Sequence, residues 1–184
     1  MVGLIIVGVV IVLLVLFIIG IYNSLIGLRN QVDNAWSQID VQLKRRHDLI
    51  PNLIETTKGY MQHERGTFEA ITNARSQAMG AKTVAESAKA EGVLGEALSK
   101  FMLVVENYPD LKANQNFLAL HEELTSTENK ISFARQNYND QVLFFNNKIQ
   151  MFPSNVIAGA FSFGKRDFFQ VESAVEREVP KVSF

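Results

Sequence analysis

Residues 2–21 read VGLIIVGVVIVLLVLFIIGI and contain no charged side chain. At about 1.5 Å of rise per residue, an α-helix of this length crosses the roughly 30 Å hydrocarbon core of a bilayer. A helix is the expected form despite the many β-branched residues, because a single segment in lipid must satisfy its own backbone hydrogen bonds. The stretch therefore predicts a single transmembrane helix over residues 1–23, around which the rest of the chain is organised.

Two other interpretations of this run are weaker. A cleaved signal peptide would have a basic start, a shorter apolar core and a cleavage site flanked by small residues. No Lys or Arg precedes the run, and Gly20-Ile21-Tyr22 is a poor cleavage site. A buried core helix is usually shorter than this stretch, and with no Cys in the chain a lipidated cysteine is excluded.

Composition narrows the class of the remaining chain. The 184 residues carry a formal net charge of −1 with both signs mixed, which argues against a nucleic-acid-binding protein. Zero Cys residues rule out disulfides and thiolate metal sites. Arg29 lies close behind the span, so the positive-inside bias favours a cell-membrane protein with its domain on the cytoplasmic face.

The apolar pattern does not stop where the span ends. Apolar residues at spacings of three and four follow the span, at Leu25, Leu28, Val32, Ala35 and Ile39. The helix is therefore expected to continue from the bilayer into the domain. Pro51 lacks a backbone donor and clashes with the carbonyl four residues earlier, so it predicts a kink. The pattern resumes at Leu53 and predicts one kinked helix that runs to a cap at Gly80.

Two further helices are predicted after Gly80. Thr83 and Glu86 have the spacing of a capping box, which starts the first of them. Asp110 can cap the second, which carries a seven-residue apolar repeat at Phe117, Leu124, Ile131, Tyr138, Phe145 and Phe152. Such a repeat predicts coiled-coil-like packing against a partner of similar length, for which the first helix is the candidate.

The pattern as a whole predicts an all-α chain. We expect the transmembrane helix to lead into an elongated antiparallel helical bundle of long coiled-coil-like helices over residues 24–160. An aromatic tail over residues 161–184 follows.

Several segments, in order along the chain, resemble the bacterial LemA family. They are residues 41–53 (VQLKRRHDLIPNL), 108–117 (YPDLKANQNF), 122–124 (EEL), 127–129 (TEN), 134–135 (AR), 138–139 (YN), 152–155 (FPSN) and 168–169 (FF). The resemblance covers essentially the whole chain. It implies a single-pass membrane protein with an elongated helical bundle and supplies no catalytic residue. The association of some family members with bacterial magnetosome membranes implies a role in membrane organisation.

No enzyme motif stands out. His63 and His121 are each followed by Glu, which is half of a zinc-binding HExxH motif. Thr67 and Thr125 occupy the positions where the second His would stand. We therefore expect no metal, no cofactor and no catalytic residue.

Charged residues beside the apolar repeat are the remaining site candidates. His121, Glu128 and Arg135 are spaced by seven, and Arg75 has a similar place on the first long helix. Polar groups at such positions commonly fix helix register, so a structural polar layer is favoured over a ligand site. The basic run 44–46 fans around its helix, either as a solvated ring of charge or as a contact for anionic headgroups or an acidic partner.

The sequence leaves two functions open. The favoured one is a non-enzymatic scaffold in the lipid bilayer that forms homo-oligomers and organises or shapes the membrane. Its candidate self-association clasp is Phe161, Phe163, Phe168 and Phe169, because so many aromatic side chains are not left in water. The alternative is a membrane-tethered sensor or adaptor that binds an unknown soluble protein partner or peptide on its bundle.

Overall fold

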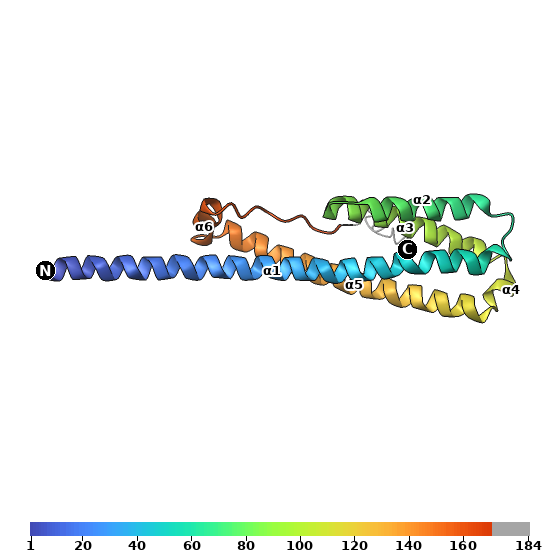
Figure 1. Ribbon diagram of the computed structural model, residues 1–184, viewed down its shortest axis with the longest axis horizontal. Coiled ribbons are helices and arrows are strands. Elements are labelled where there is room, and N and C mark those ends of the chain that lie inside the picture. Colours follow the sequence, from blue (N-terminus) through green and yellow to red (C-terminus); the bar gives the residue numbers. More distant parts are fainter. Residues whose placement is uncertain (171–184) are drawn as a thin grey trace, which may run out of the picture. The chain divides into compact units, whose positions relative to one another are not determined.

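The computed structural model describes residues 1–170 of the chain. This part is all-helical and contains no strand, which confirms the predicted all-α class (Figure 1). The expected aromatic tail is described only as far as residue 170, and its residues 171–184 lie outside the described part. The helices are α1 (Val2–Lys58), α2 (Arg65–Gly80), α3 (Val84–Val105), α4 (Pro109–Lys112), α5 (Gln115–Gln150) and α6 (Ser154–Ala160).

The chain divides into two compact units. Within the described residues, unit 1 consists of Met1–Ile39 and Ala134–Asp167, and unit 2 consists of Asp40–Phe133 and residues 168–170. Helices α1 and α5 contribute to both units, whereas α2, α3 and α4 belong to unit 2 and α6 to unit 1. The sequence predicted one bundle and gave no sign of this division.

Helix α1 is one continuous helix of 57 residues. Its first part is apolar and long enough to cross a membrane. None of this apolar stretch is buried against the rest of the protein. The helix then continues into the packed part of the chain, as predicted from the unbroken apolar spacing. Pro51 lies inside α1, which runs on to Lys58, so a loop at this position is excluded.

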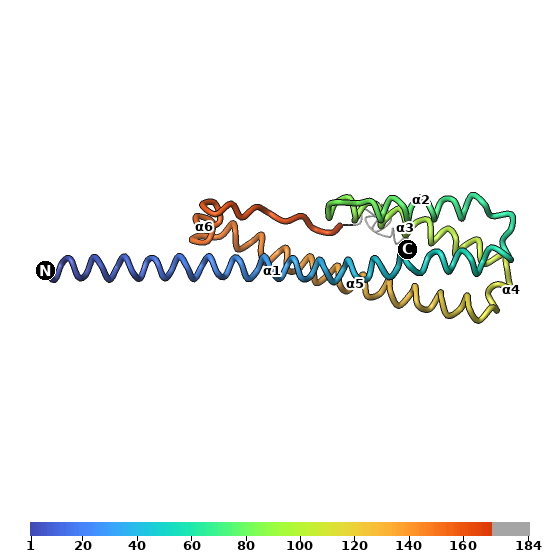
Figure 2. The backbone as a smooth tube through the Cα atoms, in the orientation of Figure 1, coloured from blue at the N-terminus to red at the C-terminus, as the bar shows by residue number. Residues whose placement is uncertain are grey.

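The prediction that this helix reaches Gly80 is wrong. It ends at Lys58, and the chain reverses before α2 begins at Arg65 (Figure 2). The backbone N–H groups of Tyr60 and Met61 both donate to the Thr57 carbonyl, and the Met61 side chain is fully buried. The apolar spacing is the same before and after this turn, so the pattern alone predicts a continuous helix. The chain turns because Met61 is buried in the turn.

Unit 2 is built from four long helical segments, of α1, α2, α3 and α5, and the short helix α4. Consecutive helices run antiparallel, and α2 and α3 lie side by side (Figure 1). Their apolar stripes meet in one core, in which α1 supplies mainly Leu and Ile while α2 supplies small side chains that permit close approach. The core residues are Ile50, Leu53, Ile54, Met61, Ile71, Ala74, Ala78, Leu94, Phe101, Val105, Leu111, Phe117 and Leu124.

Of two helix caps predicted from the sequence, one is confirmed and one is wrong. The Thr83 side chain accepts from the Glu86 N–H, and the Glu86 carboxylate accepts from the Thr83 N–H, which confirms the capping box. The expectation that Asp110 caps the long helix is wrong. Asp110 lies inside the short α4, and Asn114 Oδ1 accepts from the N–H groups of residues 116 and 117 at 2.9 and 3.1 Å. Asn114 therefore provides the side-chain cap of α5.

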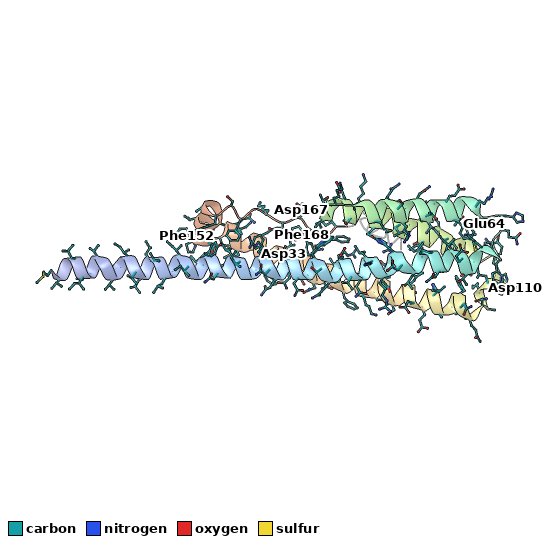
Figure 3. All side chains as sticks on the ribbon, viewed as in Figure 1. Asp33, Glu64, Asp110, Phe152, Asp167 and Phe168 are labelled. Atoms are coloured by element: carbon teal, nitrogen blue, oxygen red, sulfur yellow. The ribbon has the colours of Figure 1, made fainter. Side chains whose placement is uncertain are left out.

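The seven-residue repeat is buried along α5 except at its last position. The first five members are buried, with Tyr138 at 2% and Phe145 at 1% exposure, as the pattern predicted. Phe152 is instead 82% exposed. It lies beyond the end of α5 at Gln150, in the turn before α6, where the helical spacing no longer applies (Figure 3).

Unit 1 packs α1 against α5 and the chain that follows α6. The rings of Trp36 and Tyr138 meet edge to face at 5.6 Å. Asn146 bonds the backbone of Arg166 in both directions, as donor and as acceptor, at 2.9 Å each. The Arg166 side chain pairs with Asp33 of α1 at 3.0 Å. These bonds hold the segment after α6 against both long helices of the unit.

Candidate functional site

Unit 2 contains a buried charge cluster centred on Arg46 of α1. Its side chain is 4% exposed, and Nη1 lies 2.9 Å from Glu128 Oε2 and 3.7 Å from Glu91 Oε2. Nη2 donates to the backbone carbonyl of Glu91 at 3.4 Å. The guanidinium thereby connects α1 with α3 and α5.

His47, the next residue of α1, extends this cluster. Its Nε2 lies 2.6 Å from Glu91 Oε1, and its backbone carbonyl accepts from Arg75 Nε of α2 at 2.8 Å. Glu91 therefore contacts two neighbouring basic side chains while only 5% exposed. Helices α1, α2, α3 and α5 therefore all contribute to this cluster.

The cluster is not completely hydrogen-bonded. Arg46 Nε and Glu91 Oε2 are buried and have no hydrogen-bond partner in the described part of the chain. The 3.7 Å approach of Glu91 Oε2 to Arg46 is an attraction between charges that is too long for a hydrogen bond. Desolvation of both charges offsets much of this attraction. We expect the cluster to specify which helix faces meet more than to add stability.

The predicted polar layer has members inside and outside this cluster. Glu128 pairs with Arg46, and Arg75 bonds the His47 carbonyl. His121 is exposed and its ring stacks on Phe117 at 6.0 Å, outside the charge cluster. Arg135 is half-buried and belongs to unit 1.

Three members of the cluster were missed: Arg46, His47 and Glu91. A solvated ring of charge describes Lys44 and Arg45, which are exposed, but is wrong for Arg46. The available signal was spacing, because Arg46 follows Leu43 by three and precedes Ile50 by four on the buried stripe of α1. Glu91 likewise lies on the buried stripe of α3, three residues after buried residue 88 and three before buried residue 94.

A groove opens over this cluster between α3 and α5. It has a volume of about 630 Å³, and Arg46 forms part of its lining. Its apolar walls come from Leu98, Met102, Leu103 and Leu124. The groove thus combines apolar walls with a buried charge, which is the usual composition of a binding pocket.

The groove continues onto the outer side of α5. His121, Thr125 and Asn129 line both the groove and a shallower depression that includes Leu118 and Phe133. Leu103, Leu118 and Phe133 are 71%, 49% and 74% exposed. We call the groove together with these three side chains the α3–α5 surface.

The aromatic residues of the tail divide between the two units. In unit 1, the Phe163 ring lies 5.9 Å from Tyr22 and 6.4 Å from Phe145, with the Arg29 guanidinium 5.7 Å from its centroid. Phe161 lies 4.8 Å from Tyr22 and is 55% exposed. In unit 2, Phe168 is half-buried and Phe169 is 1% exposed. A self-association clasp made of these residues stays a prediction.

Two tyrosines have shifted acidities. Burial raises the pKa of Tyr138, an effect that nearby Arg166 opposes and the carboxylates of Asp167 and Asp33 reinforce. The hydroxyl of Tyr138 donates to the Asp167 carbonyl at 2.8 Å. A hydrogen bond to Glu64 raises the pKa of Tyr108. Both groups therefore remain neutral hydrogen-bond donors at physiological pH.

Residues 1–170 contain no group of three or more His, Asp or Glu side chains placed to hold a metal ion. What the site offers chemically is an apolar cleft with a buried guanidinium in its lining.

Comparison with known proteins reveals several relatives. Protein LemA of Metamycoplasma hominis is 29% identical over 164 residues, which cover 86% of this chain and 73% of that protein. Magnetosome protein MamQ 2 of Paramagnetospirillum magneticum is 23% identical over 179 residues, covering 83% of this chain and 66% of that protein. Magnetosome protein MamQ of Magnetospirillum gryphiswaldense is 21% identical with the same coverage. The chain thus spans slightly less than two thirds of the length of the MamQ proteins.

The family assignment comes from a longer match. Residues 35–184 match the LemA family, in a region that begins beyond the apolar part of α1. This match includes α1 from residue 35 onwards, all of α5 and the charge cluster described above. The resemblance seen in the sequence is confirmed, and the chain belongs to the LemA family.

Proposed function

We propose that this protein is a non-enzymatic scaffold, anchored in the membrane by the first part of α1, that self-associates through its α3–α5 surface. The observation that carries the proposal is the exposure of Leu103, Leu118 and Phe133 around an apolar groove. In this proposal the domain lies on the cytoplasmic face, for which Arg29 provides the charge bias.

The α3–α5 surface has the composition of a protein contact. Large apolar side chains that are exposed together around a cleft mark interaction sites more often than singly exposed apolar residues do. Glu122 and Lys130 line the depression on the outer side of α5, so charges of both signs border the apolar residues. A surface with both signs of charge is compatible with a second copy of the same chain.

Anchoring favours such a contact. Chains held in one membrane meet at a higher effective concentration than chains in solution. The unburied apolar window of α1 supports the anchor, and two of the relatives are named magnetosome proteins, which is consistent with a role in membrane organisation.

The test is the size distribution of the detergent-extracted full chain, measured by native mass spectrometry. The double variant Leu103→Ser with Phe133→Ser should shift the distribution towards monomer. Its thermal melt should change little, because substitutions of exposed residues usually alter stability by about 0.5 kcal/mol or less. Val41→Ser is the matched control, since Val41 is apolar, 62% exposed and not part of the groove lining. An oligomer that persists in the double variant contradicts the proposed contact.

The tail is tested in the same assay. Phe168→Ala with Phe169→Ala weakens self-association if the tail clasps a neighbouring chain. Because Phe169 is fully buried in unit 2, a lowered melt with unchanged oligomer size would show that the tail acts within its own chain.

A sensor or adaptor is the second candidate function. The observation that favours it is the buried Arg46 Nε, which has no hydrogen-bond partner in residues 1–170 and belongs to a residue lining the groove. An acidic or carbonyl-bearing peptide in the groove would lie against the guanidinium-bearing side chain of Arg46 in its lining. A chain that stays monomeric at all concentrations in detergent would favour this function over the scaffold.

A further inference from the structure

The segment that follows α5, which includes α6 and the first residue of the tail, exposes a group of large apolar side chains. They are Met151, Phe152, Val156 and Phe161, with exposures of 61%, 82%, 60% and 55%. The sequence from 149 to 164 contains no charged residue, and Lys148 and Lys165 flank it. We call residues 151–161 the apolar turn.

The apolar turn lies beside the end of the proposed membrane span. Tyr22 directly follows the apolar run of α1, and its ring contacts Phe161 at 4.8 Å and Phe163 at 5.9 Å. The first fully buried residue of α1 is Leu25, three positions further on. A 20-residue run at about 1.5 Å per residue fills the hydrocarbon core, so Tyr22 marks the level of the bilayer surface.

From this placement we infer that the apolar turn is a second membrane contact, which inserts Phe152 and its exposed neighbours into the leaflet boundary next to the span. An apolar segment held at this level contacts lipid without any further movement of the chain. Segments that lie on a membrane bury apolar side chains, Phe among them, at the boundary between headgroups and acyl chains. The two flanking Lys residues can extend to the headgroups while their stems stay apolar.

The charges of the tail do not oppose this contact. They begin at Lys165, after the uncharged stretch, and Arg166 is already paired with Asp33 at 3.0 Å. The contact is therefore apolar in origin, and it should persist in bilayers of neutral lipid.

The inference uses the membrane anchor of the proposed function but not self-association, because every residue involved belongs to unit 1. The test uses the full chain in nanodiscs with brominated lipids, which quench tryptophan at known depths. Trp36→Phe removes the one native tryptophan and keeps an aromatic ring, and single reporters are then introduced at other phenylalanines.

The reporter Phe152→Trp should be quenched strongly, and more by bromines near the headgroups than by bromines deep in the acyl chains. Phe161→Trp should behave in the same way. Phe144→Trp is the matched control: this side chain is 58% exposed on α5 and belongs to the same unit. It lies eight residues before Phe152, about 12 Å along a helix, and its quenching should be several-fold weaker.

Phe17→Trp separates failure of this contact from failure of the anchor, because Phe17 lies inside the apolar run and is 55% exposed. If it is quenched while both turn reporters are not, the apolar turn is not a membrane contact although the anchor stands. If none of the three is quenched, the anchor is wrong as well. Turn reporters shielded from both bromolipid and aqueous acrylamide would indicate a second copy over the turn and would also overturn the inference.

Discussion

Replacement of Glu91 by Leu should strongly destabilise the folded chain. Glu91 is 5% exposed and lies 2.6 Å from His47 Nε2 and 3.7 Å from Arg46 Nη1. Without it, the buried guanidinium of Arg46 keeps only Glu128, whose side chain is 61% exposed and therefore partly screened. Removal of one partner of a buried ion pair costs about 3–5 kcal/mol, and the remaining Glu128 places this case near 3 kcal/mol. At about 2–4 °C per kcal/mol for a chain of this size, the melting temperature should fall by roughly 6–12 °C.

Circular dichroism melts of the full chain in detergent measure this change. Glu123→Leu is the control, because Glu123 pairs with Arg45 where the two side chains are 39% and 50% exposed, and such a pair contributes about 0–1 kcal/mol. Adding Arg46→Met to Glu91→Leu should recover part of the loss, since no unpaired charge then remains buried. Equal melting temperatures for Glu91→Leu and Glu123→Leu would refute the reasoning from burial.

Three further predictions concern other contacts. The folded-state pKa of Tyr138 is raised above its ordinary value of 10.0, so its stabilising effect is complete below pH 10 and is lost as the pH rises through the folded-state value. Tyr138→Phe should therefore flatten the alkaline decline of stability in pH-dependent denaturant titrations, and an unchanged decline would contradict this. Asn114→Ala should lower stability by about 1 kcal/mol in urea denaturation, because the first N–H groups of α5 lose their cap, whereas an Asp110→Ala variant with the larger effect would contradict the assignment. Ile131→Asp should cost several kcal/mol because Ile131 is 5% exposed, while Asn137→Asp on the exposed side of α5 should cost little, and equal thermal melts would refute the seven-residue repeat.

Patterns with a local physical cause were predictable from the sequence. The helix over the uncharged run at residues 2–21, the capping box at Thr83 and the burial of the first five positions of the seven-residue repeat are confirmed, and the membrane span itself stays a prediction. Each depends on spacing along a single helix. The LemA resemblance likewise rested on short strings in a fixed order.

Features that depend on contacts between helices were not predictable. The chain turns at residues 59–64 although the apolar spacing continues, because Met61 finds a buried place in the turn. Asn114 rather than Asp110 caps α5, and its Nδ2 also donates to the Tyr60 hydroxyl at 3.1 Å, a bond between distant parts of the sequence. Arg46 and Glu91 have the spacing of core residues. Their burial depends on their pairing, which the sequence does not show, so each charge is expected in solvent.

The continuity of α1 fixes the rotation of its apolar run relative to the packed part of the same helix. No break in the helix separates the apolar run from Leu25, which is fully buried. A rotation of one part of the helix therefore rotates the other. Each residue added to a helix turns everything beyond it by about 100°. Inserting one residue after Tyr22 would leave the length and hydrophobicity of the apolar run almost unchanged, yet would rotate that run relative to the packed part of α1. The rotational orientation of the apolar run is therefore coupled, through one continuous helix, to the packed part of α1, where Trp36 contacts Tyr138.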